Sequence, residues 1–204
     1  MKLYDGALSG NAYKARLFLS LLGLDHELVP VDLRAGENRT EAYLKRNPRG
    51  QIPVLEDGEV TIWDSQAILV YLARRYGGEQ WLPLDPAPMA EVMQWLAVSE
   101  NELLFGLARA RAVKKFGRDF DLAACQTYGK AGLRVLDGHL RKREWLACGH
   151  PTIADVACFP YVALAPEGEI PLDEYAGVLD WIERMKALPG FVAMEGISAG
   201  AQTA

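Results

Sequence analysis

The sequence has few of the residues and patterns on which several large classes of protein depend. Its 204 residues include three cysteines, Cys125, Cys148 and Cys158, with no CxxC pair, so a disulfide framework is not expected. No stretch approaches the ~18 consecutive apolar residues of a membrane span. The N-terminal residues lack the apolar core of a signal peptide. With a net charge of -5, the chain is poorly suited to bind nucleic acid or an anionic membrane. These features predict a cytoplasmic protein.

The sequence also lacks the motifs of metal sites, serine nucleophiles and phosphate-binding loops. The three histidines, His26, His139 and His150, are scattered and have no carboxylate or cysteine at a metal-ligand spacing, so no metal site is predicted. There is no GxSxG nucleophile motif and no GxxxxGK[ST] or GxGxxG phosphate-binding loop. An enzyme with this sequence is therefore expected to obtain its chemistry from a bound cofactor or cosubstrate.

The first 78 residues alternate between strand and helix patterns. In chain order the predicted elements are a strand at 2–4, a helix at 11–22, a strand at 27–32, a helix at 40–46, strands at 52–56 and 59–62, and a helix at 64–77. Pro30 favours a sheet edge for the second strand, because proline lacks the N–H that a central strand needs. Asp57-Gly58 predicts a hairpin with a type I′ turn. This part is therefore predicted to be an α/β domain.

The rest of the chain shows only helical periodicity. Residues 79–88 contain spaced prolines that interrupt regular structure, and they predict a linker between a domain at 1–78 and an all-α domain at 89–204. Thr152 and Asp155 have the spacing of a capping box at the start of an apolar helix.

One loop suggests chemistry from its residues alone. Ser9-Gly10-Asn11 lies between the first predicted strand and the first predicted helix. The unpaired N–H groups and positive partial charge of a helix N-terminus favour an anion, and Ser9 and Asn11 add a hydroxyl and an amide. The simpler interpretation is that one of them only caps the helix. Both interpretations remain open.

Four segments, in this order, resemble the cytosolic glutathione S-transferase family. They are residues 9–16 (SGNAYKAR), 47–55 (NPRGQIPVL), 63–68 (WDSQAI) and 151–155 (PTIAD). The resemblance extends over nearly the whole chain. It implies a thioredoxin-like N-terminal domain that binds glutathione, and an all-helical C-terminal domain that supplies most of the second-substrate pocket.

The resemblance also implies roles for individual residues that bind glutathione. Ile52 is expected to pair its backbone with the cysteinyl part of glutathione, and Pro53 is expected to be cis. Asp64 and Ser65 are expected to hold the γ-glutamyl end, a role compatible with ordinary helix capping. Two further binding residues, Asn38 and Gln51, are placed by the same resemblance, Asn38 near the glycine end.

Ser9 matches the hydroxyl of the serine-type classes, and Asn11 matches an amide of some bacterial relatives, so both are expected to stabilise the glutathione thiolate. Cysteine-type chemistry is not expected, because no cysteine lies in the first 124 residues. For the second-substrate pocket we expect Leu8, Phe105 and Arg109. The basic run from Arg109 to Arg118 has two open interpretations, a solvated helix face or a funnel for an anionic substrate or glutathione.

The resulting prediction is a homodimeric glutathione transferase that activates glutathione, its cosubstrate, for attack on a small hydrophobic electrophile, with a role in detoxification. Two alternatives remain open: a glutathione-dependent isomerase or dehalogenase, and a noncatalytic protein of this fold that binds a ligand or partner.

Overall fold

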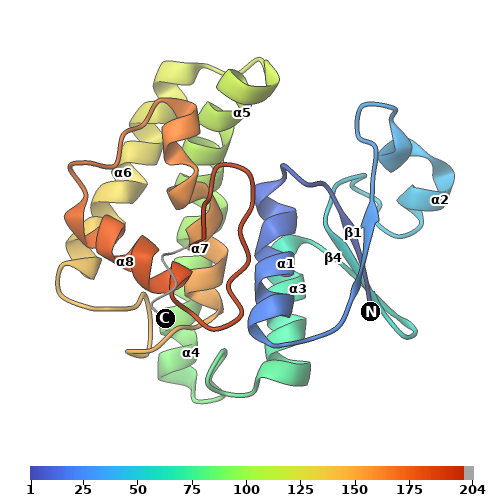
Figure 1. The fold of residues 1–204 in the computed structure, drawn as a ribbon, viewed down its shortest axis with the longest axis horizontal. Helices are drawn as coiled ribbons and strands as arrows, with labels where there is room; N and C mark the ends of the chain where they lie inside the picture. The colour runs from blue at the N-terminus through green and yellow to red at the C-terminus, as the bar shows by residue number, and fades with distance from the viewer. Residues whose placement is uncertain (200–204) are drawn as a thin grey trace.

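The computed structural model describes residues 1–199, which form an α/β part followed by a helical part (Figure 1). The α/β part contains a four-stranded sheet of order β2-β1-β3-β4. Its strands are β1 (Lys2–Asp5), β2 (Glu27–Pro30), β3 (Val54–Asp57) and β4 (Val60–Trp63). β2 runs parallel to β1, whereas β3 is antiparallel to both β1 and β4. The edge position predicted for the Pro30 strand is confirmed.

The helices of this part follow the predicted order. They are α1 (Gly10–Leu21), α2 (Glu41–Leu44) and α3 (Ser65–Leu72), with a 3-10 turn η1 (Glu37–Arg39) and a π-helical turn η2 (Ala73–Gly77). Figure 1 shows α1 and α3 between the sheet and the helical part, and α2 beyond the sheet on the opposite side. Thr40 caps α2 through the backbone N–H of Tyr43, as predicted.

The hairpin between β3 and β4 is confirmed, but its predicted type I′ turn at Asp57-Gly58 is wrong. Asp57 pairs with Val60, so Gly58 and Glu59 form the turn. A type I′ turn needs positive φ at both turn residues, and only Gly58 has it, with φ 59°. The pairing register decides which residues turn, and it includes Asp57 in the strand.

The second part is all-helical, as predicted. One long helical run consists of α4 (Pro86–Val98), the π-helical segment η3 (Ser99–Ala108) and α5 (Arg109–Phe116); it is followed by α6 (Leu122–Leu140), α7 (Ile153–Ala163), a 3-10 turn η4 (Ala165–Gly168) and α8 (Ala176–Lys186). The helical run begins at Pro86, inside the range predicted as a linker. The predicted domain at 89–204 ends with residues 200–204, which lie outside the described residues. Within residues 1–199, no helix combines the length and apolar character needed to cross a membrane.

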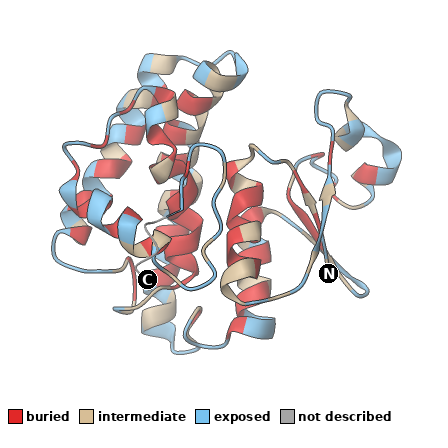
Figure 2. Cartoon of the chain, viewed as in Figure 1, coloured by how far each residue is buried: buried red, intermediate tan, exposed pale blue. Residues whose placement is uncertain are grey.

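The two parts share one large core in which α1 packs against α7, and the α/β part has a small second cluster of Val31, Tyr43 and Val54. Figure 2 shows buried residues concentrated on these two helices, and every residue of α7 from Ile153 to Val162 is buried. The capping box at Thr152 and Asp155 is present, so it fixes where this buried helix begins.

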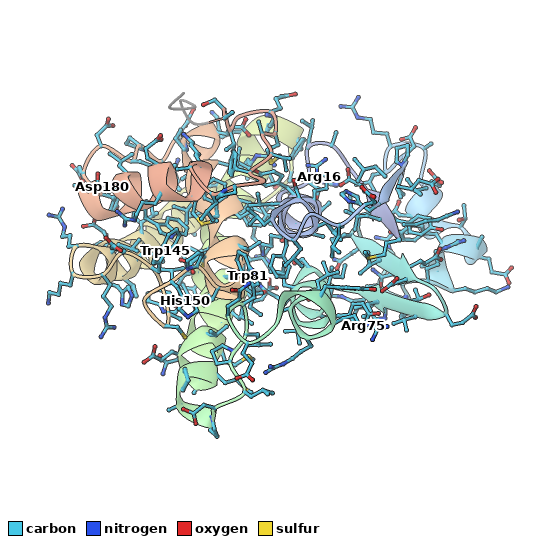
Figure 3. All side chains as sticks on the ribbon, turned by 60° about the horizontal axis from the view of Figure 1, so that its bottom comes forward. Arg16, Arg75, Trp81, Trp145, His150 and Asp180 are labelled. Carbon is cyan, nitrogen blue, oxygen red and sulfur yellow. The ribbon has the colours of Figure 1, made fainter. Side chains whose placement is uncertain are left out.

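Two segments outside the helices connect the parts. Trp81, labelled in Figure 3 near the junction, packs its ring on Phe18 of α1 at a centroid distance of 4.9 Å, and its carbonyl accepts a hydrogen bond from Ile153 N–H. The chain after α8 returns to α1, where Tyr13 Oη donates to Val192 O at 2.6 Å. The position of α1 therefore depends on contacts from both parts of the chain.

Candidate active site

A cleft of about 790 Å³ opens where the loop between β1 and α1 faces the helical part. Three predicted site residues line it: Leu8, Ser9 and Ile52. Its other lining residues come from the β1–α1 loop, the segment after β2, the η3–α5 region and α7: Gly6, Ala7, Gly10, Val31, Asp32, Leu33, Arg34, Ala108, Arg111, Ala112, Phe116, Arg118 and Tyr161.

Sheet register brings the predicted glutathione-binding residues to one end of the sheet. Val54 pairs with Trp63, so Pro53 and Asp64, the residues next to this pair, lie at the same end of the sheet. On the other side of β3, a Cβ added to Gly6 would lie 2.5 Å from Ile52 Cδ1, which places Ile52 against the segment after β1. Three strand ends separated in the sequence therefore meet beside the cleft.

Ser9 is the N-cap of α1, and this capping role is compatible with the chemical one. Its Oγ accepts a hydrogen bond from the backbone N–H of Ala12 at 3.2 Å. Because this bond uses an oxygen lone pair, the hydroxyl hydrogen remains available for a second partner. Ser9 is half-buried and lines the cleft. The capping bond fixes the position of a hydroxyl that can still donate.

The first turn of α1 packs against α7 of the helical part. A Cβ added to Gly10 would lie 2.5 Å from Tyr161 Cε1, so only glycine fits between the helix and this ring. Burial raises the pKa of the Tyr161 hydroxyl to about 12, while Arg111 and the backbone N–H of Asn11 act in the opposite direction. Asn11 is half-buried, and its Oδ1 has no hydrogen-bond partner among the described residues. It does not line the cleft.

The peptide bond between Ile52 and Pro53 is cis, as the family resemblance implied. The residues before it are held from two sides, because Gln51 O accepts hydrogen bonds from Tyr43 Oη at 3.0 Å and from Asn47 Nδ2 at 2.7 Å. The side chain of Gln51 is exposed. Asn38 donates from Nδ2 to Gly50 O at 2.6 Å, so its amide N–H supports this loop.

Asp64 and Ser65 form the start of α3. Asp64 has φ 80° and caps the helix, with Oδ1 accepting from Gln66 N–H at 2.9 Å and Ala67 N–H at 3.4 Å. Its Oδ2 lies 3.3 Å from Arg49 Nη1. Ser65 is 3% exposed. The pair combines a negative charge with helix N-terminal N–H groups, the two features that an ammonium and a carboxylate on one ligand require.

Arg111 of α5 holds the loop that carries Ser9. It is 2% exposed, donates from Nη1 to Leu8 O at 2.8 Å, and pairs through Nε with the Glu167 carboxylate. Its Nη2 is buried and has no hydrogen-bond partner among residues 1–199. The helical part thus fixes the backbone next to the cap.

Phe105 and Arg109, predicted for the second-substrate pocket, lie elsewhere on the same helical run. The Arg109 guanidinium stacks on the Phe105 ring at 4.1 Å and on Phe120 at 4.8 Å, and neither predicted residue lines the cleft. Their role in the second-substrate pocket stays a prediction.

A buried lysine joins α1 to the helical part behind the site. Lys14 Nζ donates to Ser99 Oγ at 3.1 Å and lies 3.5 Å from Glu100 Oε1, and Gln66 Nε2 donates to the same two oxygens at 3.1 Å and 2.9 Å. Burial lowers the pKa of Lys14, and the Glu100 carboxylate acts against this shift. The helix that carries the Ser9 loop is therefore linked to α3 and η3 through shared acceptors.

Comparisons with known proteins decide which family this arrangement belongs to. The family model described as "Glutathione S-transferase, N-terminal domain" matches residues 1–74, and "Glutathione S-transferase, C-terminal domain" matches residues 108–184. A probable glutathione S-transferase of Oryza sativa is 31% identical over 202 residues, which cover 93% of each chain. The chain belongs to the glutathione S-transferase family. Its α/β part is accordingly a thioredoxin-like domain, as the resemblance implied.

Three further relatives of this glutathione S-transferase family member are bacterial. The crystal structure of a glutathione S-transferase from Pseudomonas fluorescens has a TM-score of 0.89 and 35% identity, and covers 95% of this chain and 98% of its own. A glutathione S-transferase structure from Xanthobacter autotrophicus has a TM-score of 0.87 and 34% identity, with 95% and 96% covered. A maleylacetoacetate isomerase of Pseudomonas aeruginosa is 30% identical over 200 residues, covering 94% of this chain and 93% of its own.

Sequence reasoning missed Tyr161 as a residue of the cleft and gave Arg111 no separate role. Tyr161 lies in an apolar helix whose pattern indicates only burial, and Arg111 lies in a basic run that resembles a solvated face. The local pattern contains no signal for Tyr161, and for Arg111 it left the two interpretations of the basic run open. Both residues reach the cleft through packing between the two domains.

Proposed function

We propose that this protein is a glutathione transferase that activates the glutathione thiol for attack on a small electrophile. The observation that supports this most directly is the Ser9 hydroxyl, which lines the cleft while its oxygen is fixed by Ala12 N–H. Ile52, whose backbone precedes the cis proline, lines the same cleft.

Glutathione would lie across the end of the sheet where the strand termini meet. Ile52 would pair its backbone with the cysteinyl residue, and Asp64 and Ser65 would hold the γ-glutamyl end through charge and helix N–H groups. Asn38 and Gln51 would contribute at the other end, Asn38 by shaping the Gly50 loop. This orientation directs the thiol towards Ser9 and Asn11 at the start of α1.

Thiolate stabilisation is the catalytic step assigned to the protein itself. A free thiol with a pKa near 8.5 is only ~3% ionised at pH 7, and the thiolate is the nucleophile. Lowering this pKa by about two units corresponds to about 2.7 kcal/mol and raises the thiolate fraction roughly twenty-five-fold. Donation from Ser9, donation from the side-chain amide of Asn11, and the α1 dipole would all favour the charged form.

The proposed assembly is a homodimer, and the proposed role is detoxification, as the family resemblance implies. The proposed location is the cytoplasm, as the composition predicts. Sedimentation equilibrium tests the assembly: a monomeric mass at micromolar concentration would contradict it.

The ultraviolet absorbance of bound glutathione thiolate, measured against pH, tests the proposed function. We expect a pKa well below 8.5 in the natural protein and a higher value in Ser9→Ala. Binding with an unshifted pKa would favour the noncatalytic alternative, and no binding of glutathione would overturn the proposal.

A glutathione-dependent isomerase is a second candidate, because one relative of nearly full coverage is named maleylacetoacetate isomerase. Transfer consumes one glutathione per turnover, whereas isomerisation regenerates it. Following free thiol during turnover of maleylacetoacetate therefore separates the two activities.

A further inference from the structure

The lining of the cleft carries a charge that contrasts with the rest of the molecule. Three of its residues are arginines, Arg34, Arg111 and Arg118, and one is acidic, Asp32. The whole chain has a net charge of -5. A basic cleft in an acidic protein attracts anions, since low-dielectric walls concentrate the local field.

Among the described residues, only one of the three arginines of the cleft has a carboxylate partner, Arg111 with Glu167. Asp32 Oδ1 accepts the backbone N–H groups of Arg34 and Ala35, each at 2.9 Å, so this carboxylate organises the loop. Among residues 1–199, Arg34 and Arg118 make no ion pair, and both are exposed.

Arg111 is held inside the wall with one donor unused. Its carboxylate partner, Glu167, is shared with Lys115, whose Nζ lies 2.6 Å from Glu167 Oε1. Lys115 Nζ also lies 3.0 Å from Glu195 Oε1, so two carboxylates face these two cations. Buried Nη2 has no acceptor among the described residues, an arrangement that is unfavourable until an acceptor arrives. An oxygen of an anionic group seated beside Arg111 would supply that acceptor.

The cleft also has an apolar wall. Phe116 and Leu33 line it with 42% and 45% of their surfaces exposed, and the Arg111 guanidinium lies 5.2 Å from the centre of the Phe116 ring. Exposed apolar side chains beside cationic ones are suited to a ligand with an apolar body and an anionic end.

We propose that the second substrate is an anionic electrophile, an apolar molecule with a carboxylate or similar group that lies against Arg111 and Arg118. This proposal rests on the proposed glutathione transferase function and names the substrate class for the same cleft. Arg118 and Arg111 belong to the helical domain, so they are placed for the electrophile, whereas Asp64 and Ser65 serve glutathione.

A matched pair of benzyl chlorides provides the test. In para-(chloromethyl)benzoate and para-(chloromethyl)benzamide the reactive carbon is the same, and only the first is an anion. The glutathione thiolate forms an S–C bond to the benzylic carbon, chloride leaves with the electron pair of the broken C–Cl bond, and the thiol proton goes to solvent. The two conjugates, S-(carboxybenzyl)glutathione and S-(carbamoylbenzyl)glutathione, allow the same comparison by calorimetry without turnover.

We expect the dissociation constant of the carboxylate conjugate to be at least about fivefold lower than that of the amide conjugate at low salt. A ratio of this size is what a charge-assisted hydrogen bond contributes. Rising salt should reduce this ratio, because counterions screen exposed charges. Arg118→Gln should also reduce it, and kcat/KM for the two chlorides should change in the same direction. Arg134→Gln, an exposed arginine on α6 that does not line the cleft, is the matched control and should keep the ratio.

Equal affinity for the two conjugates in the natural protein would overturn the proposal. An equal loss of affinity for both conjugates in Arg118→Gln would also overturn it, since this result would mean that Arg118 contacts the glutathione part of the conjugates. If glutathione and both conjugates fail to bind, the proposed function itself fails.

Discussion

Arg111 Nη1 donates a hydrogen bond to the carbonyl oxygen of Leu8 at 2.8 Å, across 103 residues of sequence. Leu8 immediately precedes Ser9, the cap of α1, so an arginine of the helical domain holds the backbone from which the proposed thiol-activating hydroxyl projects. Glu167 in turn holds Arg111. The position of Ser9 is therefore set by the packing of the two domains as much as by its own loop.

Ser9→Ala should lower turnover roughly tenfold or more with little change in glutathione affinity, because a single donor to a developing anion contributes strongly in a partly buried site. The variant also loses a helix cap, which costs about 1 kcal/mol of folding stability. Steady-state kinetics and urea unfolding measure the two effects. Ser9→Thr keeps both hydroxyl and cap and is the control. If Ser9→Ala turns over as fast as the natural protein, thiolate stabilisation would instead be assigned to Asn11.

Asp64→Asn separates the charge of Asp64 from its capping role. Asparagine retains an oxygen for Gln66 N–H and has nearly the same shape as aspartate, so the melting temperature should change little. Loss of the negative charge should raise KM for glutathione about tenfold, as expected for a charge-assisted hydrogen bond. Asp64→Ala removes both properties and should lower stability too. An unchanged KM for glutathione in Asp64→Asn would show that Asp64 does not bind the γ-glutamyl end of glutathione through its charge.

Gly10→Ala should destabilise the protein by about 1–3 kcal/mol, because the new methyl group would overlap the Tyr161 ring. Helix propensity alone predicts the opposite, a gain of nearly 1 kcal/mol for alanine over glycine. In a Tyr161→Ala background the same substitution should therefore be neutral or stabilising. Urea unfolding of the double-mutant cycle measures the coupling. Additive effects would show that the ring is not the obstacle.

Asp155 should make folding stability depend on pH. It is fully buried and accepts hydrogen bonds from Thr152 N–H, Leu146 N–H and Trp181 Nε1–H, yet burial raises its pKa to about 6. In the unfolded chain the carboxyl ionises near 3.8. Between these values the unfolded state releases its proton first, so this group's contribution to stability falls as pH rises, and is constant above about 6.

The whole fall is about 3 kcal/mol, from a shift of about two pKa units, and about 2 kcal/mol of it occurs between pH 4.5 and pH 6.5. Urea unfolding at pH 4.5 and 6.5 should show it as a loss in the natural protein relative to Asp155→Asn, which cannot ionise. Asp121→Asn, at the exposed cap of α6, is the control and should keep the natural pH dependence. A pH-independent difference between the natural protein and Asp155→Asn would contradict the prediction.

Much of the architecture follows from local signals. The caps at Thr40 and Thr152 are correctly predicted because a cap depends on residues within one turn of the helix. The turn type at Gly58 is not, because it depends on which residues pair across the hairpin.

The wall of the cleft shows a second limit. Arg111 lies two residues after the predicted Arg109, a rotation of about 200° around a helix. The π-helical segment η3 precedes both and changes the helical register that a regular period assumes. Regular helical spacing therefore does not give the direction of the side chains that follow Ser99–Ala108.

The sequence by itself determined the order of elements, the family, and the local backbone structure at Ser9, Ile52 and Asp64. All of these depend on short contiguous motifs. Only the tertiary structure decided that Tyr161 packs on Gly10 and that Arg111 holds Leu8. The physical reason is distance along the chain: these contacts form when α5 and α7 pack against the start of α1, and no local pattern encodes the face that each helix presents.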